Sequence, residues 1–209
     1  MKAFDIITET DARTLEIGSS VTLKPGGHVT PLAADTLKAR RITVHSGVAE
    51  ASLDGQAPVA PVRALAIGSD HGGVALKAAL RDYLRQKGLS VLDVGTDGPE
   101  SVDYPDIAAQ AARLVARKEV DAAIVIDGAG IGSAIAANKI DGVRAAMCND
   151  KTLARYAREH NGANVLTLGA TLISVDDAKA IVDTWLATPM GEARYLRRLA
   201  KIRALEKTQ

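Results

Sequence analysis

The chain has 209 residues, of which 47% are hydrophobic and 24% charged, and its formal net charge is +1. This length can bury a full core and fits one globular domain with an appendage. The near-zero charge and the aromatic content of 3% argue against a nucleic-acid binder. No apolar run approaches the roughly 20 residues of a membrane span, and the single cysteine, Cys148, fits a reducing compartment. We therefore expect a cytoplasmic protein that binds neither nucleic acid nor membrane.

The amino-terminal part is expected to be a small α/β appendage, residues 1–45. In VTPLAADTLKARRITV, Thr30 is the predicted N-cap of a short helix and Pro31 its first residue, and the strand ITV follows. No catalytic cluster is evident there. Residues 46–62 are rich in Gly, Ala, Ser and Pro, which is typical of a linker. The main domain is then predicted to span residues 63–209.

Strands and helices alternate through the main domain. Apolar runs predict strands at 64–69, 90–95, 121–127, 142–148 and 163–169. Helical spacing predicts helices at 73–88, 106–118, 150–159, 175–187 and 191–207, and a further helix that begins near residue 132. Strands that are apolar throughout are typical of a parallel sheet covered on both faces, so we predict a doubly wound, Rossmann-like sheet of five parallel strands. Ligands of such sheets bind beyond the carboxyl ends of the strands.

A glycine-rich turn follows the third predicted strand of this domain. The segment DGAGIGSAIAANK begins at Asp127 and places Gly128, Gly130 and Gly132 between a strand and a helix. Small residues let a ligand approach the backbone closely, and the N–H groups of a helix start favour anions. The segment lacks the GK[ST] ending of a nucleoside triphosphate loop and departs from GxGxxG. A tight turn without a ligand is the alternative interpretation.

Other side chains at element ends could act on an anionic ligand. Asp70 and His71 follow the first strand of the domain and could hold and protonate ligand oxygens, or be a cap with an exposed histidine. His160 ends a helix, where it could be a general acid or base or could compensate the helix dipole. Arg194 and Arg198 lie one helical turn apart and could grip one phosphate, or belong to a solvated basic face.

Taken together, these segments resemble the type B ribose-5-phosphate isomerases and the related galactose-6-phosphate isomerase subunits. The motifs IGSDHGG, VDYPDIA, DGAGIGSAIAANKIDGVRAA and AREHNGANVLTLGA occur in the family's order within about residues 64–207. The resemblance implies an aldose–ketose isomerase of ribose 5-phosphate or a related sugar phosphate, which works through an enediol without a metal or cofactor. It also implies a homodimer with sites built from both subunits.

The resemblance further implies the role of each site residue. An Asp–His pair contacts sugar and phosphate, a tyrosine lines the pocket, a histidine assists ring opening beside an asparagine, a glycine turn stabilises an oxyanion, and two arginines hold the phosphate. The Asp–His pair is Asp70 and His71, and the pocket tyrosine is Tyr104. The ring-opening histidine is His160, with Asn161 beside it. The oxyanion turn consists of Gly128, Gly130 and Gly132, and the phosphate is held by Arg194 and Arg198. The residues expected to be catalytic are Asp127, His160 and Asp70.

The chain departs from the family pattern at the glycine turn. Asp127 stands where many members have a basic cysteine, and Ser133 stands where others have a glutamate. Ala129 occupies a position at which threonine or serine is frequent, and Thr171 occupies one at which arginine is frequent. We therefore expect Asp127 to be the enediol base. Its free pKa of about 3.9 would have to be raised by burial, against the N–H dipoles of the turn. The alternative is a turn-stabilising carboxylate in a non-catalytic sugar-phosphate binding or regulatory protein.

Two further expectations concern residues outside this site. VTPLAADTLKARRITV resembles the TPxAxxxLxxxxI segments near the starts of several enzymes of bacterial microcompartments. That similarity implies contact of residues 1–45 with a microcompartment shell or cargo, and a location inside such a compartment; a subunit-interface role is the alternative. Cys148 is expected to be a buried core residue and not a nucleophile.

Overall fold

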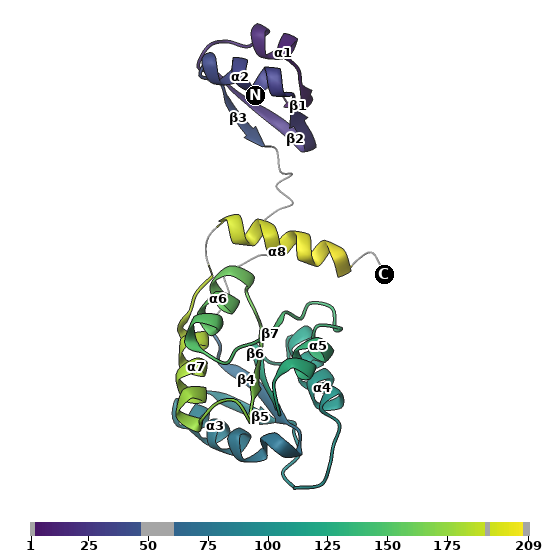
Figure 1. Cartoon of the computed structure of the whole chain (residues 1–209), viewed down its shortest axis with the longest axis vertical. Coiled ribbons are helices and arrows are strands. Elements are labelled where there is room, and N and C mark those ends of the chain that lie inside the picture. Colours follow the sequence, from purple (N-terminus) through teal and green to yellow (C-terminus); the bar gives the residue numbers. More distant parts are fainter. Residues whose placement is uncertain (1–2, 47–60, 191–192, 207–209) are drawn as a thin grey trace. The chain divides into compact units, whose positions relative to one another are not determined.

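The computed structural model describes residues 3–46, 61–190 and 193–206. The chain separates into two compact units, Met1–Gln56 and Ala57–Gln209 (Figure 1). Most of the predicted linker, residues 46–62, lies outside the described residues. Each unit has a hydrophobic core of its own, as the clusters of buried side chains show.

The first unit is a three-stranded parallel sheet with two helices. Its elements are β1 (Ala3–Ile7), α1 (Glu9–Thr14), β2 (Ser20–Val29), α2 (Pro31–Ala39) and β3 (Thr43–Ser46), and β2 lies between β1 and β3. Thr30 is the N-cap of α2 and Pro31 its first residue, as the sequence predicts. The sequence predicted only this helix and the strand ITV in the unit, so β1, α1 and β2 were missed. Lys24–Gly27 within β2 has the composition of a turn, and the six residues of α1 are too few for a helical period.

The second unit contains the predicted sheet of five parallel strands. The strands are β4 (Ala64–Ser69), β5 (Ser90–Asp93), β6 (Ala122–Asp127), β7 (Ala145–Met147) and β8 (Val165–Gly169), in the order β5-β4-β6-β8-β7. From β4 the chain first moves outward to β5 and then crosses to the other side at β6. The strand order therefore reverses between β4 and β6, which is where doubly wound sheets bind ligands.

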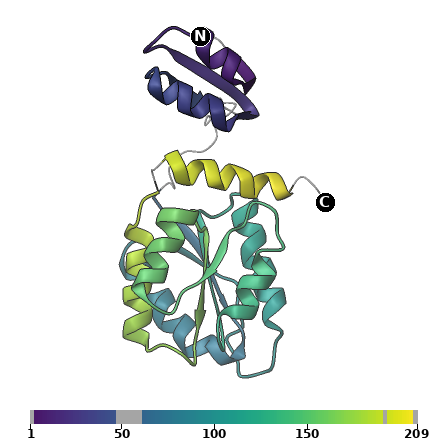
Figure 2. The ribbon, with the colours of Figure 1, turned by 45° about the horizontal axis from the view of Figure 1, so that its top comes forward.

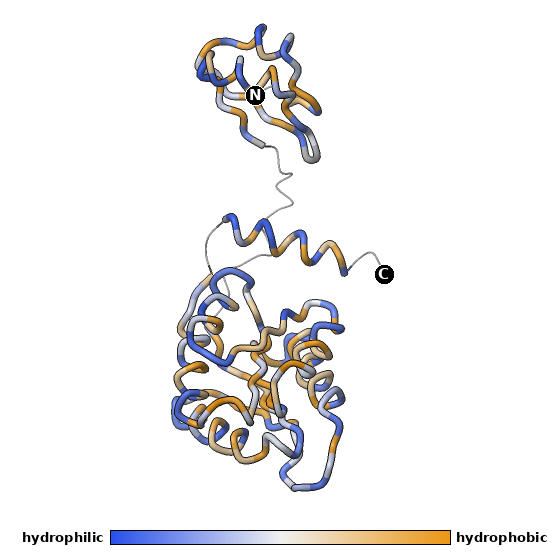
Figure 3. The backbone as a smooth tube through the Cα atoms, viewed as in Figure 1, coloured by the Kyte–Doolittle hydropathy of each residue, from blue (hydrophilic) through white to orange (hydrophobic). Residues whose placement is uncertain are grey.

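Helices cover both faces of this sheet (Figures 1 and 2). The helices are α3 (Val74–Gln86), α6 (Lys151–Asn161) and α7 (Val175–Ala187) on one face, α4 (Tyr104–Ala116) and α5 (Ile131–Ala137) on the other, and α8 (Ala193–Glu206). Leu65, Ile67 and Ile124 pack toward the first face, whereas Ala66 and Ala123 pack toward the second. Figure 3 shows the apolar strands inside and the hydrophilic residues on the outer helix surfaces.

The two ends of the sheet carry different elements. A long loop, residues 94–103, and the glycine turn lie at the carboxyl end of the strands. In Figures 1 and 2, α8 crosses the opposite end, where its Glu206 accepts a hydrogen bond from the Gly142 amide at 3.0 Å. Helix α4 begins at Tyr104, two residues before the predicted start, so Tyr104 is fixed at the helix terminus. In the described part of the chain, no helix is long and apolar enough to cross a membrane.

Candidate active site

The ends of β4 and β6 are tied together at the point where the strand order reverses. The Asp70 amide donates a hydrogen bond to the Ile126 carbonyl at 3.1 Å. The Asp70 carboxylate in turn accepts the amide hydrogens of Gly72 at 3.0 Å and Gly73 at 3.1 Å, and so caps the short helical turn η1 (His71–Gly73). Asp70 thus makes the hydrogen bonds of a cap, which was the alternative interpretation of this residue, and the His71 side chain is exposed.

The carboxylate of Asp127 occupies the anion-binding position of the glycine turn. Its Oδ1 accepts the amide hydrogens of Ala129, at 2.8 Å, and of Gly130, and its Oδ2 accepts that of Ser133 at 2.9 Å. The residue is only 5% exposed. The turn therefore binds an anion as its sequence predicts, but this anion belongs to the chain.

The pKa of Asp127 lies below its ordinary value. Burial raises the pKa, but hydrogen bonds from Ser133, Gly130 and Ala129 stabilise the charged form and outweigh the burial. A base at this position needed a raised pKa, so the shift is opposite to that requirement. In the free protein, the amides of Ala129, Gly130 and Ser133 are therefore occupied by Asp127, and a ligand oxygen could bind them only by displacing this carboxylate.

The aromatic ring of Tyr104 covers the start of α5. A Cβ atom on Gly132 would lie 2.5 Å from the Tyr104 ring, so only glycine allows this approach. Gly130 has a φ of +78°, and a Cβ atom added there would lie 2.9 Å from the Leu168 backbone, so glycine is required at this position. The structure thus brings Tyr104, the glycine turn, Asp127 and the Asp70–His71 pair to one end of the sheet. Gly128 has no such close neighbour.

The remaining predicted site residues gather at the other end of the sheet. His160 lies in the last turn of α6 and is stacked on Tyr156, with the ring centroids 4.7 Å apart, and the centroid of the Tyr195 ring on α8 is 4.5 Å away. Arg194 donates to the Tyr195 hydroxyl at 2.7 Å, and the Arg198 guanidinium lies 5.9 Å from the centre of that ring. Tyr195 is 5% exposed and joins the predicted histidine to both predicted arginines, a role that the sequence analysis missed.

The two groups of residues lie at opposite ends of the same strands. Asp127 pairs with Gly169 at the carboxyl end of β6, while Ala123 pairs with Val165 at the amino end, a few residues after His160. Four residue steps along a strand separate these two pairs, a distance of about 13 Å. His160, Asn161, Arg194 and Arg198 therefore do not meet Asp127 within one chain.

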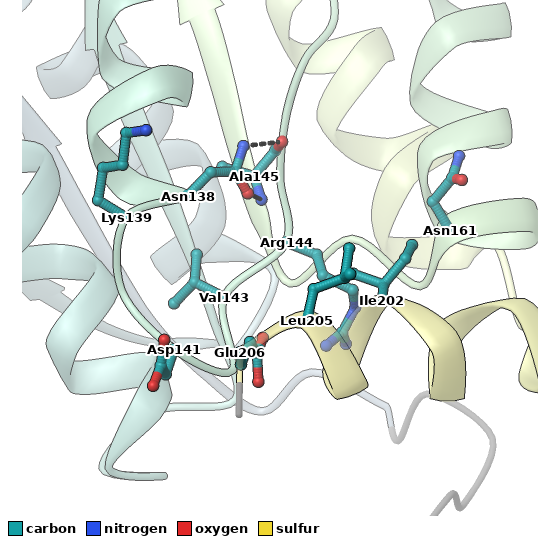
Figure 4. A pocket seen from close by; sticks show the side chains of 10 residues that line it. All are labelled: Asn138, Lys139, Asp141, Val143, Arg144, Ala145, Asn161, Ile202, Leu205 and Glu206. Atoms are coloured by element: carbon teal, nitrogen blue, oxygen red, sulfur yellow. Dashed lines mark hydrogen bonds between the residues drawn. The ribbon is translucent and has the colours of Figure 1, made fainter. Parts of the chain in front are cut away.

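A cavity of about 410 Å³ opens beside α8 at the amino end of the sheet (Figure 4). Its wall includes Asn161, the charged side chains Lys139 and Glu206, and Arg144, whose guanidinium donates to the Gly162 carbonyl at 2.8 Å. Of the residues around this cavity, only Asn161 belongs to the predicted site. The described residues contain no group of three or more His, Cys, Asp or Glu side chains that could hold a metal ion.

Three residues at which the chain departs from the family pattern have definite structural roles. Ser133 is fully buried and supplies an amide to Asp127. Thr171 donates its hydroxyl hydrogen to the Gly128 carbonyl at 2.6 Å, so it braces the turn from the end of β8. Ala129 donates its amide hydrogen to Asp127. Cys148 is 1% exposed, and burial raises the pKa of its thiol to about 12, which confirms a core residue.

A model of the ribose/galactose isomerase family matches residues 65–202. Ribose-5-phosphate isomerase B of Escherichia coli is 41% identical over 145 residues, which are 69% of this chain and 97% of that protein. D-erythrulose-4-phosphate isomerase of Pectobacterium atrosepticum is 42% identical over 123 residues, 58% of this chain and 81% of that protein. The structure of Clostridium thermocellum ribose-5-phosphate isomerase B superposes with a TM-score of 0.68 at 48% identity, over 69% of this chain and 97% of that one.

The doubly wound sheet and the glycine turn at its strand-order reversal thus have the architecture of a sugar-phosphate isomerase. The chain belongs to the ribose/galactose isomerase family. The matched residues lie in the second unit and begin at the second residue of β4, so the similarity does not include residues 3–46.

Proposed function

We propose that the second unit interconverts an aldose phosphate and its ketose phosphate through an enediol intermediate. The observation that carries this proposal is the Asp127 carboxylate at the carboxyl end of β6, on the edge that also carries Asp70, His71 and Tyr104. A base takes the proton from the carbon beside the carbonyl, and a proton returns to the neighbouring carbon. The two sugars are isomers, so the reaction consumes and releases nothing else.

Asp127 is the proposed base, although its pKa is lowered in the free protein. Oδ1 accepts two amide hydrogens and Oδ2 accepts one, so Oδ2 is the oxygen that we propose takes the substrate proton. If an oxygen of the substrate replaces Asp127 as the acceptor of these amide hydrogens, Asp127 loses the hydrogen bonds that lower its pKa. Substrate binding would thereby change a turn-capping carboxylate into a stronger base.

The substrate is proposed to be a pentose or tetrose phosphate. One relative is named for ribose 5-phosphate and another for D-erythrulose 4-phosphate, at nearly equal identity to this chain. Thr171 stands where an arginine is frequent in the family and uses its hydroxyl for the Gly128 carbonyl, so it adds no charge for a phosphate. The phosphate is then held by His71, Arg194 and Arg198.

A second copy of the chain is proposed to complete each site. His160, Asn161 and the two arginines lie at the amino end of the sheet, and so they reach Asp127 only from another subunit. Ile131 and Ile135, one turn apart on α5 beside the glycine turn, are 52% and 59% exposed and offer an apolar face to that subunit. The proposed working form is a homodimer with two shared sites.

The alternative is a sugar-phosphate binding or regulatory protein without turnover. The lowered pKa of Asp127 favours it, since a carboxylate stabilised by three amides is a weak base. One experiment separates the two functions. Ribose 5-phosphate, D-erythrulose 4-phosphate and galactose 6-phosphate are each incubated with the protein in heavy water and followed by NMR. An isomerase incorporates deuterium at the carbon beside the carbonyl of one of them, whereas a binder shifts resonances and incorporates none.

Residues 3–46 are proposed to dock the enzyme to the shell or cargo of a bacterial microcompartment in the cytoplasm. The proposal rests on the TPxAxxxLxxxxI similarity at α2, and on Ile17 and Leu32, which are 72% and 65% exposed. Deletion of residues 1–60 tests it. Loss of co-assembly with unchanged kcat supports docking, whereas loss of the dimer shows that the unit serves the subunit interface.

A further inference from the structure

The loop of residues 94–103, which joins β5 to α4, ends beside the His71 imidazole. The Val102 amide donates a hydrogen bond to His71 Nδ1 at 3.4 Å. A neutral imidazole carries one proton, and the nitrogen that accepts a hydrogen bond is the one without it. We propose that the Val102 amide selects the Nε2–H tautomer of the neutral His71 ring, so that His71 presents its Nε2–H group to a ligand.

The start of the same loop is anchored by a buried lysine. The Lys77 side chain is completely buried, and its Nζ lies 2.7 Å from Asp93 Oδ1 and 2.8 Å from Asp97 Oδ1. Asp93 is the last residue of β5, and Asp97 is in the loop, where the Lys77 hydrogen bond lowers its pKa. A buried ammonium group requires partners, so Lys77 fixes the loop relative to the strand.

The loop start also packs against the end of β4, directly before His71. The Thr96 amide donates to the Ser69 carbonyl at 3.3 Å, and the Gly95 amide donates to Asp93 Oδ1 at 3.2 Å. A Cβ atom on Gly95 would lie 2.3 Å from the Ser69 nitrogen, so the two segments are in close backbone contact. Lys77, Asp97 and Val102 are therefore positioning residues for His71.

The tautomer defines what His71 can recognise. An Nε2–H group donates a hydrogen bond, and the phosphate and hydroxyl oxygens of a sugar phosphate can accept it. This part rests on the proposed function, since it takes the ligand to be a sugar phosphate. The positive charge for the phosphate is then supplied by Arg194 and Arg198.

Nitrogen-15 NMR of histidine-labelled protein, recorded without substrate at a pH where imidazoles are neutral, measures the tautomer. The spectrum of His71→Gln assigns the His71 signals by their loss, and His160 serves as a reference within the same spectra. We expect a proton on Nε2 and none on Nδ1. A proton on Nδ1 would overturn the proposal. Because this measurement needs no turnover, its outcome is independent of whether the protein is an isomerase.

Two matched variants test the loop. Asp97→Ala removes the loop carboxylate, whose side chain is 77% exposed, and leaves Lys77 paired with Asp93. We expect the share of the Nδ1–H form of His71 to rise. Asp82→Ala is the control: it removes a carboxylate of α3 that is 60% exposed and forms an ion pair with Arg81, and the tautomer should stay as in the parent protein. An unchanged tautomer in Asp97→Ala contradicts the positioning role.

The ligand contact is tested with a conservative pair of substitutions. A glutamine amide at position 71 reaches the place of Nε2, whereas an asparagine amide reaches only that of Nδ1. Calorimetric titration with ribose 5-phosphate should give a Kd for His71→Gln about tenfold lower than for His71→Asn, the usual effect of one hydrogen bond to a charged group. Equal affinities, or tighter binding by His71→Asn, would contradict donation from Nε2.

Discussion

Asp127 Oδ2 accepts the amide hydrogen of Ser133 at 2.9 Å and so closes the glycine turn around a carboxylate of the chain itself. Six residues separate the two groups in sequence, and the first helical turn of α5 brings them together. A turn whose amides suit an external anion is thereby filled in the free protein. Capping requires this carboxylate to stay ionised and bound to the amides, whereas catalysis requires it to accept a proton.

Replacement of Asp127 by asparagine should affect both stability and turnover. The asparagine NH₂ group would face an amide donor in the turn, so we expect a loss of about 2 kcal/mol in the free energy of unfolding. If Asp127 is the base, kcat falls about 100-fold or more. Denaturant unfolding and the heavy-water assay measure the two effects. Undiminished deuterium incorporation in Asp127→Asn would remove Asp127 from the mechanism.

The stabilisation by Asp127 should disappear in acid. The folded pKa is depressed below the unfolded one, so the contribution is fully present above the unfolded pKa of about 3.9 and is lost as the pH falls through the folded pKa. The difference in unfolding free energy between the parent protein and Asp127→Asn should therefore be constant near neutral pH and shrink below about pH 4. A difference that grows on acidification would mean that the carboxylate is not stabilised by the turn.

A small external carboxylate should replace the missing side chain in Asp127→Ala. This variant leaves the amides of Ala129, Gly130 and Ser133 without their anion, and formate is small enough to enter. We expect formate to raise the Tm of the variant but not that of the parent protein. Asp150→Ala is the control, because Asp150 caps α6 through the single Leu153 amide at 2.8 Å. An equal response of both variants would indicate a general salt effect.

Two inactive variants should restore each other if sites are shared between subunits. Asp127→Asn damages the carboxyl end of the sheet, and Arg198→Ala damages the amino end. Refolded together in equal amounts, they form hybrid dimers with one intact site, and activity should return to about a quarter of the parent value. Asp127→Asn mixed with Asp70→Asn is the control, since both changes lie at the same end. Restoration only in the control pair would contradict the shared site.

A methyl group at position 132 should displace Tyr104. The Cβ of Gly132→Ala would lie 2.5 Å from the ring, which is 39% exposed and free to swing outward. Alanine is favoured over glycine in a helix by about 1 kcal/mol, so the fold should not weaken. We expect KM for the sugar phosphate to rise while the Tm stays level. In a Tyr104→Ala background, the added methyl group should change KM no further.

The thiol of Cys148 should be inert in the native protein. Its pKa of about 12 and its burial leave almost no exposed thiolate at neutral pH. Because the chain has one cysteine, the rate of modification by a thiol reagent reports directly on opening of the core around β7. We expect modification to become fast only in denaturant. Rapid native modification together with loss of turnover would place Cys148 at the active site.

The alternation of apolar strands and amphipathic helices was enough to predict the second unit. Burial on both faces makes each strand of a parallel sheet apolar, and this signal is local, so all five strands and the order of the elements could be read from residues 64–206. In the first unit the same reasoning missed β1, α1 and β2. In β2 the reason is a Lys-Pro-Gly-Gly segment inside the strand, which has the composition of a turn.

The sequence by itself determined the chemical types at the site, namely a carboxylate in a glycine turn, an Asp–His pair, a terminal histidine and two arginines one turn apart. Tertiary structure alone decided which of them meet. Whether burial or amide hydrogen bonds control the pKa of Asp127 depends on where three N–H groups point, and the separation of His160 from Asp127 depends on which end of a strand each one reaches. Both depend on positions in space that the spacing of residues along the chain does not give, and those positions are fixed by the folded backbone and its packing.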